Sequence, residues 1–112
     1  MKKVEAIIQP FKLDAVKEAL NGAGIDGLTV SEVKGFGGEK APAEAYRGGV
    51  HVPACPRFKI ETLVDDHKAT QIVEVIKRAA RTGHVGDGKI FVFSVDEVVR
   101  IRTGERGSLA IR

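Results

Sequence analysis

The amino-acid sequence predicts a small α+β protein of the ferredoxin-like class, with the element order β-α-β-β-α-β. Four short segments alternate apolar and polar residues, as strands do when they bury one face. Two other segments, one in each half of the chain, repeat apolar residues at helical spacing. The length of 112 residues suits one domain with one modest core, so we expect a single domain over residues 1–112.

The first strand and helix are expected within residues 2–24. Residues 2–9, KKVEAIIQ, place three apolar side chains on one parity: Val4, Ala6 and Ile8. Ile7 has the other parity, which indicates that the second face of this strand is partly covered too. After Pro10, residues 12–24 show helical spacing and end in glycines. The apolar positions of this helix are Leu13, Val16, Leu20 and Ala23.

The remaining elements show the same strand and helix patterns. Residues 28–36, LTVSEVKGF, and residues 57–65, RFKIETLVD, are typical of strands. Residues 66–81 form the clearest helix, which Asp65 or Asp66 is expected to cap. Its apolar face consists of Ile72, Val73, Ile76 and Ala80. Residues 89–105, KIFVFSVDEVVRIRTGE, return to strand character.

The last strand also suggests that the chain associates with copies of itself. Residues 89–93, KIFVF, are apolar on both parities, and Ile7 adds to the same surface. A small sheet with helices on one face would expose this apolar surface to water. We therefore expect a homo-oligomer.

The segment between the second and third strands is too long for a hairpin turn. Residues 35–57 contain five glycines and three prolines and show no sustained periodicity. Loops longer than about 12–15 residues are uncommon in compact domains and tend to be functional or disordered. We interpret residues 37–56 as a flexible loop that contacts a partner.

A glycine-rich motif in residues 82–93, TGHVGDGKIFVF, resembles a nucleotide-binding P-loop. Ile90 stands where that loop needs Ser or Thr, and the motif follows a helix and precedes a strand, which is the reverse of the P-loop context. Glycine-dense backbone with Lys89 can still bind phosphate. The alternative is a helix end with a tight turn, for which Gly83 and Gly86 would suffice.

Charge and composition indicate what kind of partner the chain binds and where it acts. The net charge of +3 and the pI of about 9.2 favour an anionic partner. Arg100 and Arg102 alternate, so both are expected on one side of the last extended segment, where they would bind phosphate or form a solvated face. His51 and Cys55 are too few to make a metal site. One cysteine, no signal-peptide pattern and no membrane-length apolar run favour the cytoplasm.

RNA binding and enzymatic catalysis are the two alternatives to a protein that binds a small anion. KGFG at residues 34–37 begins the RNA-recognition signature, but Gly38 and Glu39 follow where that signature has aromatic and aliphatic residues. Because the chain has five Phe, one Tyr and no Trp, an RNA-binding module is only the alternative, and we expect no nucleic acid. No Ser/His/Asp set or carboxylate pair indicates an enzyme, although weak ATP hydrolysis stays open.

Several motifs together resemble the PII nitrogen-regulatory signal-transduction proteins: IIQPFKLDAVKEAL, VSEVKGFG, YRG, RTGHVGDGKIFV and VRIRTGERG. The resemblance runs from residue 1 to about 107 and is interrupted only in the long loop. It implies a trimer of ferredoxin-like subunits that bind ATP or ADP competitively in clefts between subunits. It also implies that the long loop contacts a target protein, either a membrane transporter or a metabolic enzyme.

The resemblance also assigns residues by position. Those that would hold phosphates are Gly86, Asp87, Gly88 and Lys89, with Arg100 and Arg102 from the neighbouring subunit. Those that would surround adenine are Thr29, Glu61 and Leu63. Those at the base of the loop that would approach the nucleotide are Gly35, Gly37 and Gly38, and Ile7 completes the nucleotide-binding set.

Departures from the family pattern lie mainly in the loop, so the resemblance is to a divergent subgroup. Glu39 replaces the glutamine that coordinates Mg²⁺ and 2-oxoglutarate, and would itself be the Mg²⁺ ligand. Gln9 replaces a basic residue, whereas Arg57 would keep an anion contact. The tyrosine that is uridylylated in the family falls at or beside His51, where this chain has no tyrosine. Tyr46 matches a different tyrosine, which is not modified in the family. We expect an altered 2-oxoglutarate response and no uridylylation, with a sensor of another small ligand or metal as the alternative.

Overall fold

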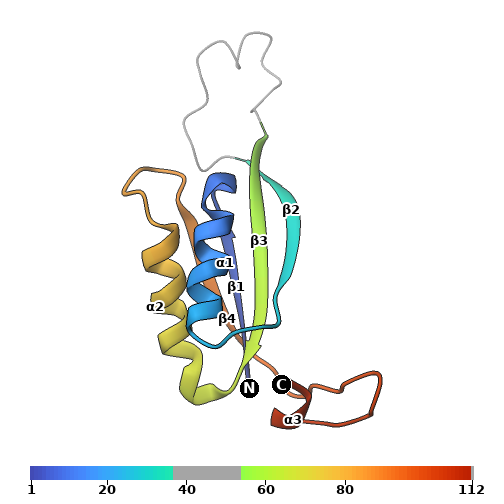
Figure 1. Ribbon diagram of the computed structural model, residues 1–112. Helices are drawn as coiled ribbons and strands as arrows, with labels where there is room; N and C mark the ends of the chain where they lie inside the picture. The colour runs from blue at the N-terminus through green and yellow to red at the C-terminus, as the bar shows by residue number, and fades with distance from the viewer. Residues whose placement is uncertain (37–53, 112) are drawn as a thin grey trace.

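A computed structural model of the chain describes residues 1–36 and 54–111 (Figure 1). The predicted order β-α-β-β-α-β is confirmed, and a short helix follows it. The elements are β1 (Lys2–Ile8), α1 (Leu13–Gly22), β2 (Thr29–Gly35), β3 (Cys55–Val64), α2 (Ala69–Ala80), β4 (Gly88–Ser94) and α3 (Ser108–Ile111). Single 3₁₀ turns, Pro10–Lys12 and Asp66–Lys68, lead into α1 and α2.

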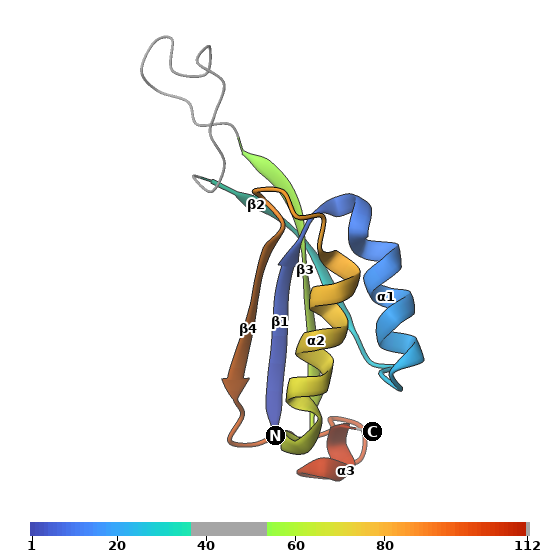
Figure 2. The same ribbon diagram turned by 90° about the vertical axis from the view of Figure 1, so that its left-hand side faces the viewer.

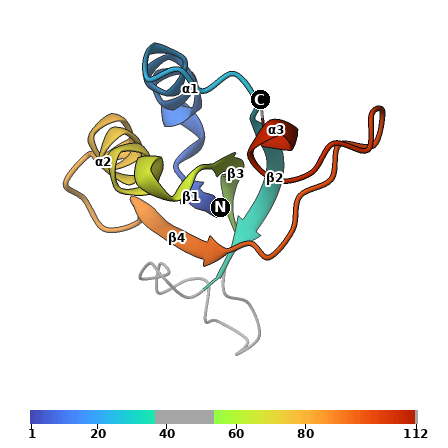
Figure 3. The ribbon, with the colours of Figure 1, turned by 90° about the horizontal axis from the view of Figure 1, so that it is seen from below.

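The four strands form one antiparallel sheet in the order β2-β3-β1-β4. The two long helices lie side by side on one face of this sheet, so the molecule has two layers (Figures 2 and 3). No described helix covers the opposite face, which is called the open face below. This is the ferredoxin-like α+β arrangement that the sequence predicts.

The core lies between the sheet and the two helices, where the period-2 and helical patterns place it. Eleven apolar residues form one buried cluster: Val4, Ala6, Ile8, Val16, Leu20, Ile60, Val64, Ala69, Ile72, Ile76 and Ala80. Burying the larger side chains of such a cluster stabilises a fold by about 1.5–3 kcal/mol each. The predicted apolar faces of both helices are thereby confirmed.

Strand β4 is the edge strand with apolar side chains on both faces. Phe91, Val92 and Phe93 are 42%, 48% and 44% exposed in the single chain. The two phenylalanine rings lie 6.4 Å apart, and the ammonium group of Lys3 lies 4.9 Å from the centre of the Phe93 ring. The structure therefore shows the exposed apolar surface from which association was predicted, and the oligomer stays a prediction.

The chain beyond β4 differs from its prediction. Strand β4 ends at Ser94, so the expected extended segment through residue 105 is wrong. A bridge pairs Val99 with Arg106, and the chain between them turns back on itself. The N–H of Gly104 donates to the carbonyl of Arg100 at 2.7 Å, which closes the turn. The alternation of residues 98–102 imitates a strand, whereas the glycine, with φ of +73°, permits the reversal.

The predicted cap of the second helix is also wrong. A 3₁₀ turn intervenes before α2, and neither Asp65 nor Asp66 makes a side-chain capping bond. Asp66 accepts instead from the amino group of Met1 at 2.6 Å, which is the main cause of the lowered pKa of this carboxyl group. Asp65 accepts from the hydroxyl of Ser108 at 2.7 Å and thereby ties α3 to the sheet.

Most of the predicted partner loop, residues 37–53, lies outside the described residues. Its expected end overlaps β3, which begins at Cys55 beside Gly35 of β2. Within the described part of the chain, none of the helices has the length and apolar character that crossing a membrane requires.

Candidate functional site

The glycine-rich loop between α2 and β4 is organised around the carboxylate of Asp87. That carboxylate accepts hydrogen bonds from the N–H of Thr82 at 3.0 Å, from the N–H of Gly83 at 2.9 Å and from the hydroxyl of Thr82. These bonds, those from Thr82 foremost, lower the pKa of Asp87, so the group stays ionised. The carboxylate is thus bound within the loop and holds its shape.

The backbone of this loop presents unpaired donors. Gly86 and Gly88 have φ of +100° and +101°. Val85, before the first glycine, and Asp87, between the two, do not have positive φ. The N–H groups of Val85 and Gly86 donate to no residue that the structure describes, whereas the N–H of Asp87 closes the turn over these two residues. Consecutive N–H groups on backbone that alternates in this way form concavities that bind anions. The geometry favours the phosphate interpretation over a simple helix end.

Gly88 is fixed by contact with β1 as well as by its φ value. A Cβ atom at this position would lie 1.7 Å from the carbonyl oxygen of Ile7 and 2.8 Å from its carbonyl carbon. Both are backbone atoms, so they cannot move aside as the end of a side chain can. Of the predicted site residues, Ile7 and Gly88 are therefore in direct contact, and the loop is seated on the end of β1.

Lys89 stands beside this loop on the open face, opposite Ile7 in the sheet register. Its side chain makes no hydrogen bond or ion pair with residues 1–36 or 54–111. Two other lysines of the open face, Lys3 and Lys59, are each within 3.5–3.8 Å of the carboxylates of Glu5 and Glu61. The ammonium group of Lys89 is therefore available to an anion, whereas those two neutralise carboxylates.

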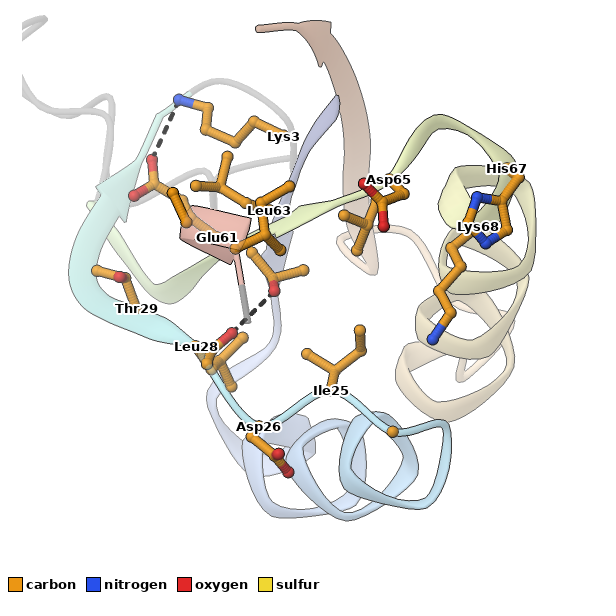
Figure 4. A pocket seen from close by; sticks show the side chains of 16 residues that line it. Lys3, Ile25, Asp26, Leu28, Thr29, Glu61, Leu63, Asp65, His67 and Lys68 are labelled. Carbon is orange, nitrogen blue, oxygen red and sulfur yellow. Dashed lines mark hydrogen bonds and ion pairs between the residues drawn. The ribbon is translucent and has the colours of Figure 1, made fainter. Parts of the chain in front are cut away.

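A second group of predicted residues lines a pocket of about 890 Å³ near the start of β2 (Figure 4). Thr29 and Glu61 face each other in the register of β2 and β3, and Leu63 follows two residues along. Figure 4 shows Thr29 and Glu61 on one side of the pocket, with His67 and Lys68 on the other. Apolar side chains also line it: Ile25, Leu28, Leu63, Ala110 and Ile111.

The pocket has the character of a site for a flat, partly polar group. Its apolar walls could enclose a ring, and the carboxylate of Glu61 can accept a hydrogen bond from an amino group. The hydroxyl of Thr62 donates to the carbonyl of Gly27 at 2.8 Å, which holds the chain that leads into β2 against β3. The structure thus brings together the three residues for which the resemblance implies adenine contacts.

The glycine-rich loop and the pocket lie at opposite corners of the sheet. The register aligns Lys89, Ile7, Lys59 and Ser31 in one row across the four strands. Lys89 is therefore three strand spacings, about 14 Å, from β2. Thr29 lies a further two residues along β2, away from the loop. A single chain consequently does not bring both groups to one small ligand.

The predicted basic residues near the carboxyl end lie at the end of the sheet that carries the pocket, although neither of them lines it. They follow the end of β4, whereas the loop precedes its start. Arg100 donates to the carboxylate of Glu105 at 2.6 Å and to the carbonyl of Leu109 in α3 at 2.9 Å. Arg102 is exposed in the turn and has no partner within the described ranges. The expectation that both project from one extended strand is wrong, because the chain reverses there.

Other predicted residues are placed as follows. Gly35 ends β2 at the end of the sheet that carries the glycine-rich loop (Figure 1). Arg57 lies on β3 near that end and donates to the carbonyl of Pro56 at 2.8 Å. Gly37, Gly38, Glu39 and His51 lie outside the described residues. In the described part of the chain, no three His, Cys, Asp or Glu residues gather as metal ligands would.

Sequence reasoning missed two supports of this site. The hydrogen bonds between Thr82 and Asp87 lie within one short segment, where the only signal is that Asp often closes turns through its side chain. The hydrogen bond from Gln9 to the carbonyl of Gly86, at 2.8 Å, joins residues 77 positions apart. No local pattern in the sequence indicates it.

Comparison with known proteins gives one consistent result. The sequence profile of the family described as "Nitrogen regulatory protein P-II" matches residues 1–105. Curated proteins of that name are similar over 99% of this chain and over their own full length. They include those of Rhodospirillum rubrum at 54% identity, Azospirillum brasilense at 57% and Synechocystis sp. at 57%.

Proposed function

The chain belongs to the nitrogen regulatory protein P-II family, and from this premise we propose that it is an ATP- and ADP-responsive signal-transduction regulator. The bound nucleotide, ATP or ADP, determines how residues 37–56 contact a target protein. The observation that carries the proposal is the glycine-rich loop, which combines the unpaired backbone N–H groups of Val85 and Gly86 with the uncommitted ammonium of Lys89. The proposed role is regulatory binding in the cytoplasm, not catalysis.

The two corners of the sheet support a binding site that is shared between copies of the chain. One copy supplies the glycine-rich loop for the phosphates. The next copy supplies the pocket at Thr29 and Glu61 for the base, together with Arg100 and Arg102. The exposed apolar surface of β4 is suited to burial between copies, since a monomer would leave it in water. We propose a trimer, as the family resemblance implies.

The assembly can be tested by mass. Sedimentation equilibrium should give about three times the chain mass of 12.0 kDa. Replacing Phe91 and Phe93 on the apolar surface by serine should shift the mass toward that of one chain. A wild-type protein that stays a stable monomer at micromolar concentration would contradict the proposed assembly.

Nucleotide binding is tested by calorimetric titration of ATP and of ADP. Both should bind, and each should displace the other. Single-stranded RNA should give no heat, because the chain lacks a stacking platform of aromatic residues. If RNA bound and neither nucleotide did, the RNA-binding alternative would replace the proposal. Steady release of inorganic phosphate would point to an enzyme instead.

We also propose that 2-oxoglutarate binds weakly or not at all. The Glu39 carboxylate stands where the resemblance implies a neutral amide, and two unit charges about 4 Å apart interact by about 4 kcal/mol at an effective dielectric of 20. Mg²⁺ held by Glu39 would offset part of this repulsion. The side chain of Gln9, at the other altered position, is neutral and engaged with Gly86.

Calorimetric titration of 2-oxoglutarate into protein saturated with Mg-ATP checks this expectation. Glu39→Gln should gain at least tenfold in affinity, because it restores the neutral ligand. Glu32→Gln, an exposed substitution on β2, serves as the matched control. Micromolar binding by the unaltered protein would refute the proposal.

We propose that the protein is not regulated by uridylylation, because the position of the modified tyrosine falls at or beside His51 and no tyrosine stands there. The target of residues 37–56 is proposed to be a membrane transporter or a metabolic enzyme. Retention of partners on the immobilised protein in ATP, compared with ADP, would identify it.

A further inference from the structure

The short helix α3 forms one wall of the pocket at the start of β2. Ala110 and Ile111, which line the pocket, are also the two residues of α3 that are partly buried. Ser108 and Leu109 are exposed, and no residue of α3 is fully buried. The helix has four residues, and a helix of this length is not stable by itself in water. Its position therefore depends on contacts with the rest of the protein.

Asp65 ties α3 to the body of the protein. The hydroxyl of Ser108 donates to the carboxylate of Asp65 at 2.7 Å, across 43 positions of the sequence. The hydrogen bonds from Arg100 to Glu105 and to the carbonyl of Leu109, in contrast, lie within the segment that follows β4. Those two bonds shape the segment and do not connect it to the sheet.

Asp65 is itself held in place on both sides. It directly follows β3, whose last residue, Val64, is buried in the core. Its carbonyl accepts from the N–H of Lys68 at 3.0 Å, in the 3₁₀ turn before α2. Asp65 also has the parity of Glu61 and Leu63, to which base contacts are assigned, and it lines the pocket with them (Figure 4). Asp65 is thus a fixed anchor beside the base site.

We infer that Asp65 and Ser108 are positioning residues of the base site, which hold α3 where Ala110 and Ile111 form an apolar wall against a bound purine base. The assignment of a base to this pocket rests on the proposed function, whereas the attachment of α3 to Asp65 does not. An apolar wall favours a flat ring and offers nothing to a phosphate, so this pair acts on the base part of the ligand alone.

The test uses the full-length protein and Asp65→Ala, which removes the acceptor. Affinity for adenosine, ADP and ATP should fall by the same factor, about three- to tenfold, as expected when one apolar wall of a base site is lost. Ser108→Ala should have the same effect, and the double variant should lose no more than either single variant. Asp65→Asn should keep most of the affinity, because its amide oxygen still accepts from the hydroxyl.

Asp26→Ala is the matched control. Asp26 also lines the pocket and is exposed, but its side chain makes no hydrogen bond with the residues that the structure describes. This variant should leave all three affinities unchanged. If Asp26→Ala or Asp65→Asn weakened binding as much as Asp65→Ala, negative charge at the pocket would explain the effect, and the inference would be wrong.

A second measurement follows α3 without any ligand. ¹³C relaxation should show a lower order parameter for the δ1 methyl of Ile111 in Asp65→Ala and an unchanged one in Asp65→Asn. The δ1 methyl of Ile8, which is buried in the core, serves as the internal reference. If wild-type protein binds no nucleotide, the proposed function fails and relaxation still decides the role of Asp65. Unchanged order at Ile111 in Asp65→Ala, or a loss of affinity for ATP but not for adenosine, would overturn the inference.

Discussion

Gly88→Ala is expected to abolish measurable ATP and ADP binding and to destabilise the fold by about 2–4 kcal/mol. Two physical costs combine at this position. The φ of +101° is strained for any residue with a Cβ atom, and the added Cβ would lie 1.7 Å from the carbonyl oxygen of Ile7. Because β4 is an edge strand, its first residues should separate from β1, which would carry Lys89 and the loop donors out of position.

Gly83→Ala is the matched control for this substitution. Its φ of +88° gives a similar backbone strain, but a Cβ atom there would meet nothing within 4 Å. It should therefore cost about 1 kcal/mol and leave nucleotide binding nearly intact. Calorimetry gives the affinities, and thermal unfolding at one fixed protein concentration gives the stabilities. Equal behaviour of the two variants would show that contact with Ile7 does not set the loop.

Lys89→Ala is expected to weaken ATP and ADP binding about ten- to a hundredfold. A hydrogen bond between an ammonium group and a phosphate is worth about 1.5–3 kcal/mol, which corresponds to that range. The fold should be unaffected, because the side chain of Lys89 has no hydrogen bond or ion pair with the described residues to lose. Lys89→Ala should weaken the binding of ATP and ADP more than the binding of adenosine, which has no phosphate for the ammonium group to contact.

Two further variants test whether nucleotide binding depends on a positive charge at residue 89 or only on the net charge of the protein. Lys89→Arg keeps a cation that fits phosphate oxygens and should retain most of the affinity. Lys77→Ala removes one positive charge from the exposed face of α2, where the ammonium group lies 3.5 Å from Glu74, and should change little. If Lys77→Ala weakened ATP binding as much as Lys89→Ala, net charge alone would explain the effect, and the loop would lose its assignment.

Much of the fold could be predicted because its signals are local. Alternation in β1 and β3 and the helical spacing of α2 each follow from which side chains the core buries. The region after β4 could not be predicted in the same way. Residues 98–102 alternate as a strand does, but Gly104 and the bond from Arg100 to Glu105 reverse the chain. Alternation indicates a strand only where another strand is available to pair.

The candidate site could be predicted in part, for the same reason. Glycine density and Lys89 indicate an anion cradle within one short segment of the sequence. The hydrogen bonds that the Asp87 carboxylate accepts from Thr82 and Gly83 were not predicted, and they show that this group braces the loop. The contribution of Gln9 depends on the tertiary fold, which alone brings residue 9 to residue 86.

Because Lys89 and Thr29 lie at opposite corners of the sheet, each chain in the proposed trimer serves two nucleotides, one at each corner. A mixture of normal and altered chains in one trimer then has a specific consequence. A chain altered at both corners would inactivate both nucleotide sites to which it contributes, although a normal neighbouring chain supplies the other part of each site. A defective allele would therefore act dominantly over a normal copy in the same cell. A chain altered at only one corner would still complete the site of a neighbour whose defect is at the other.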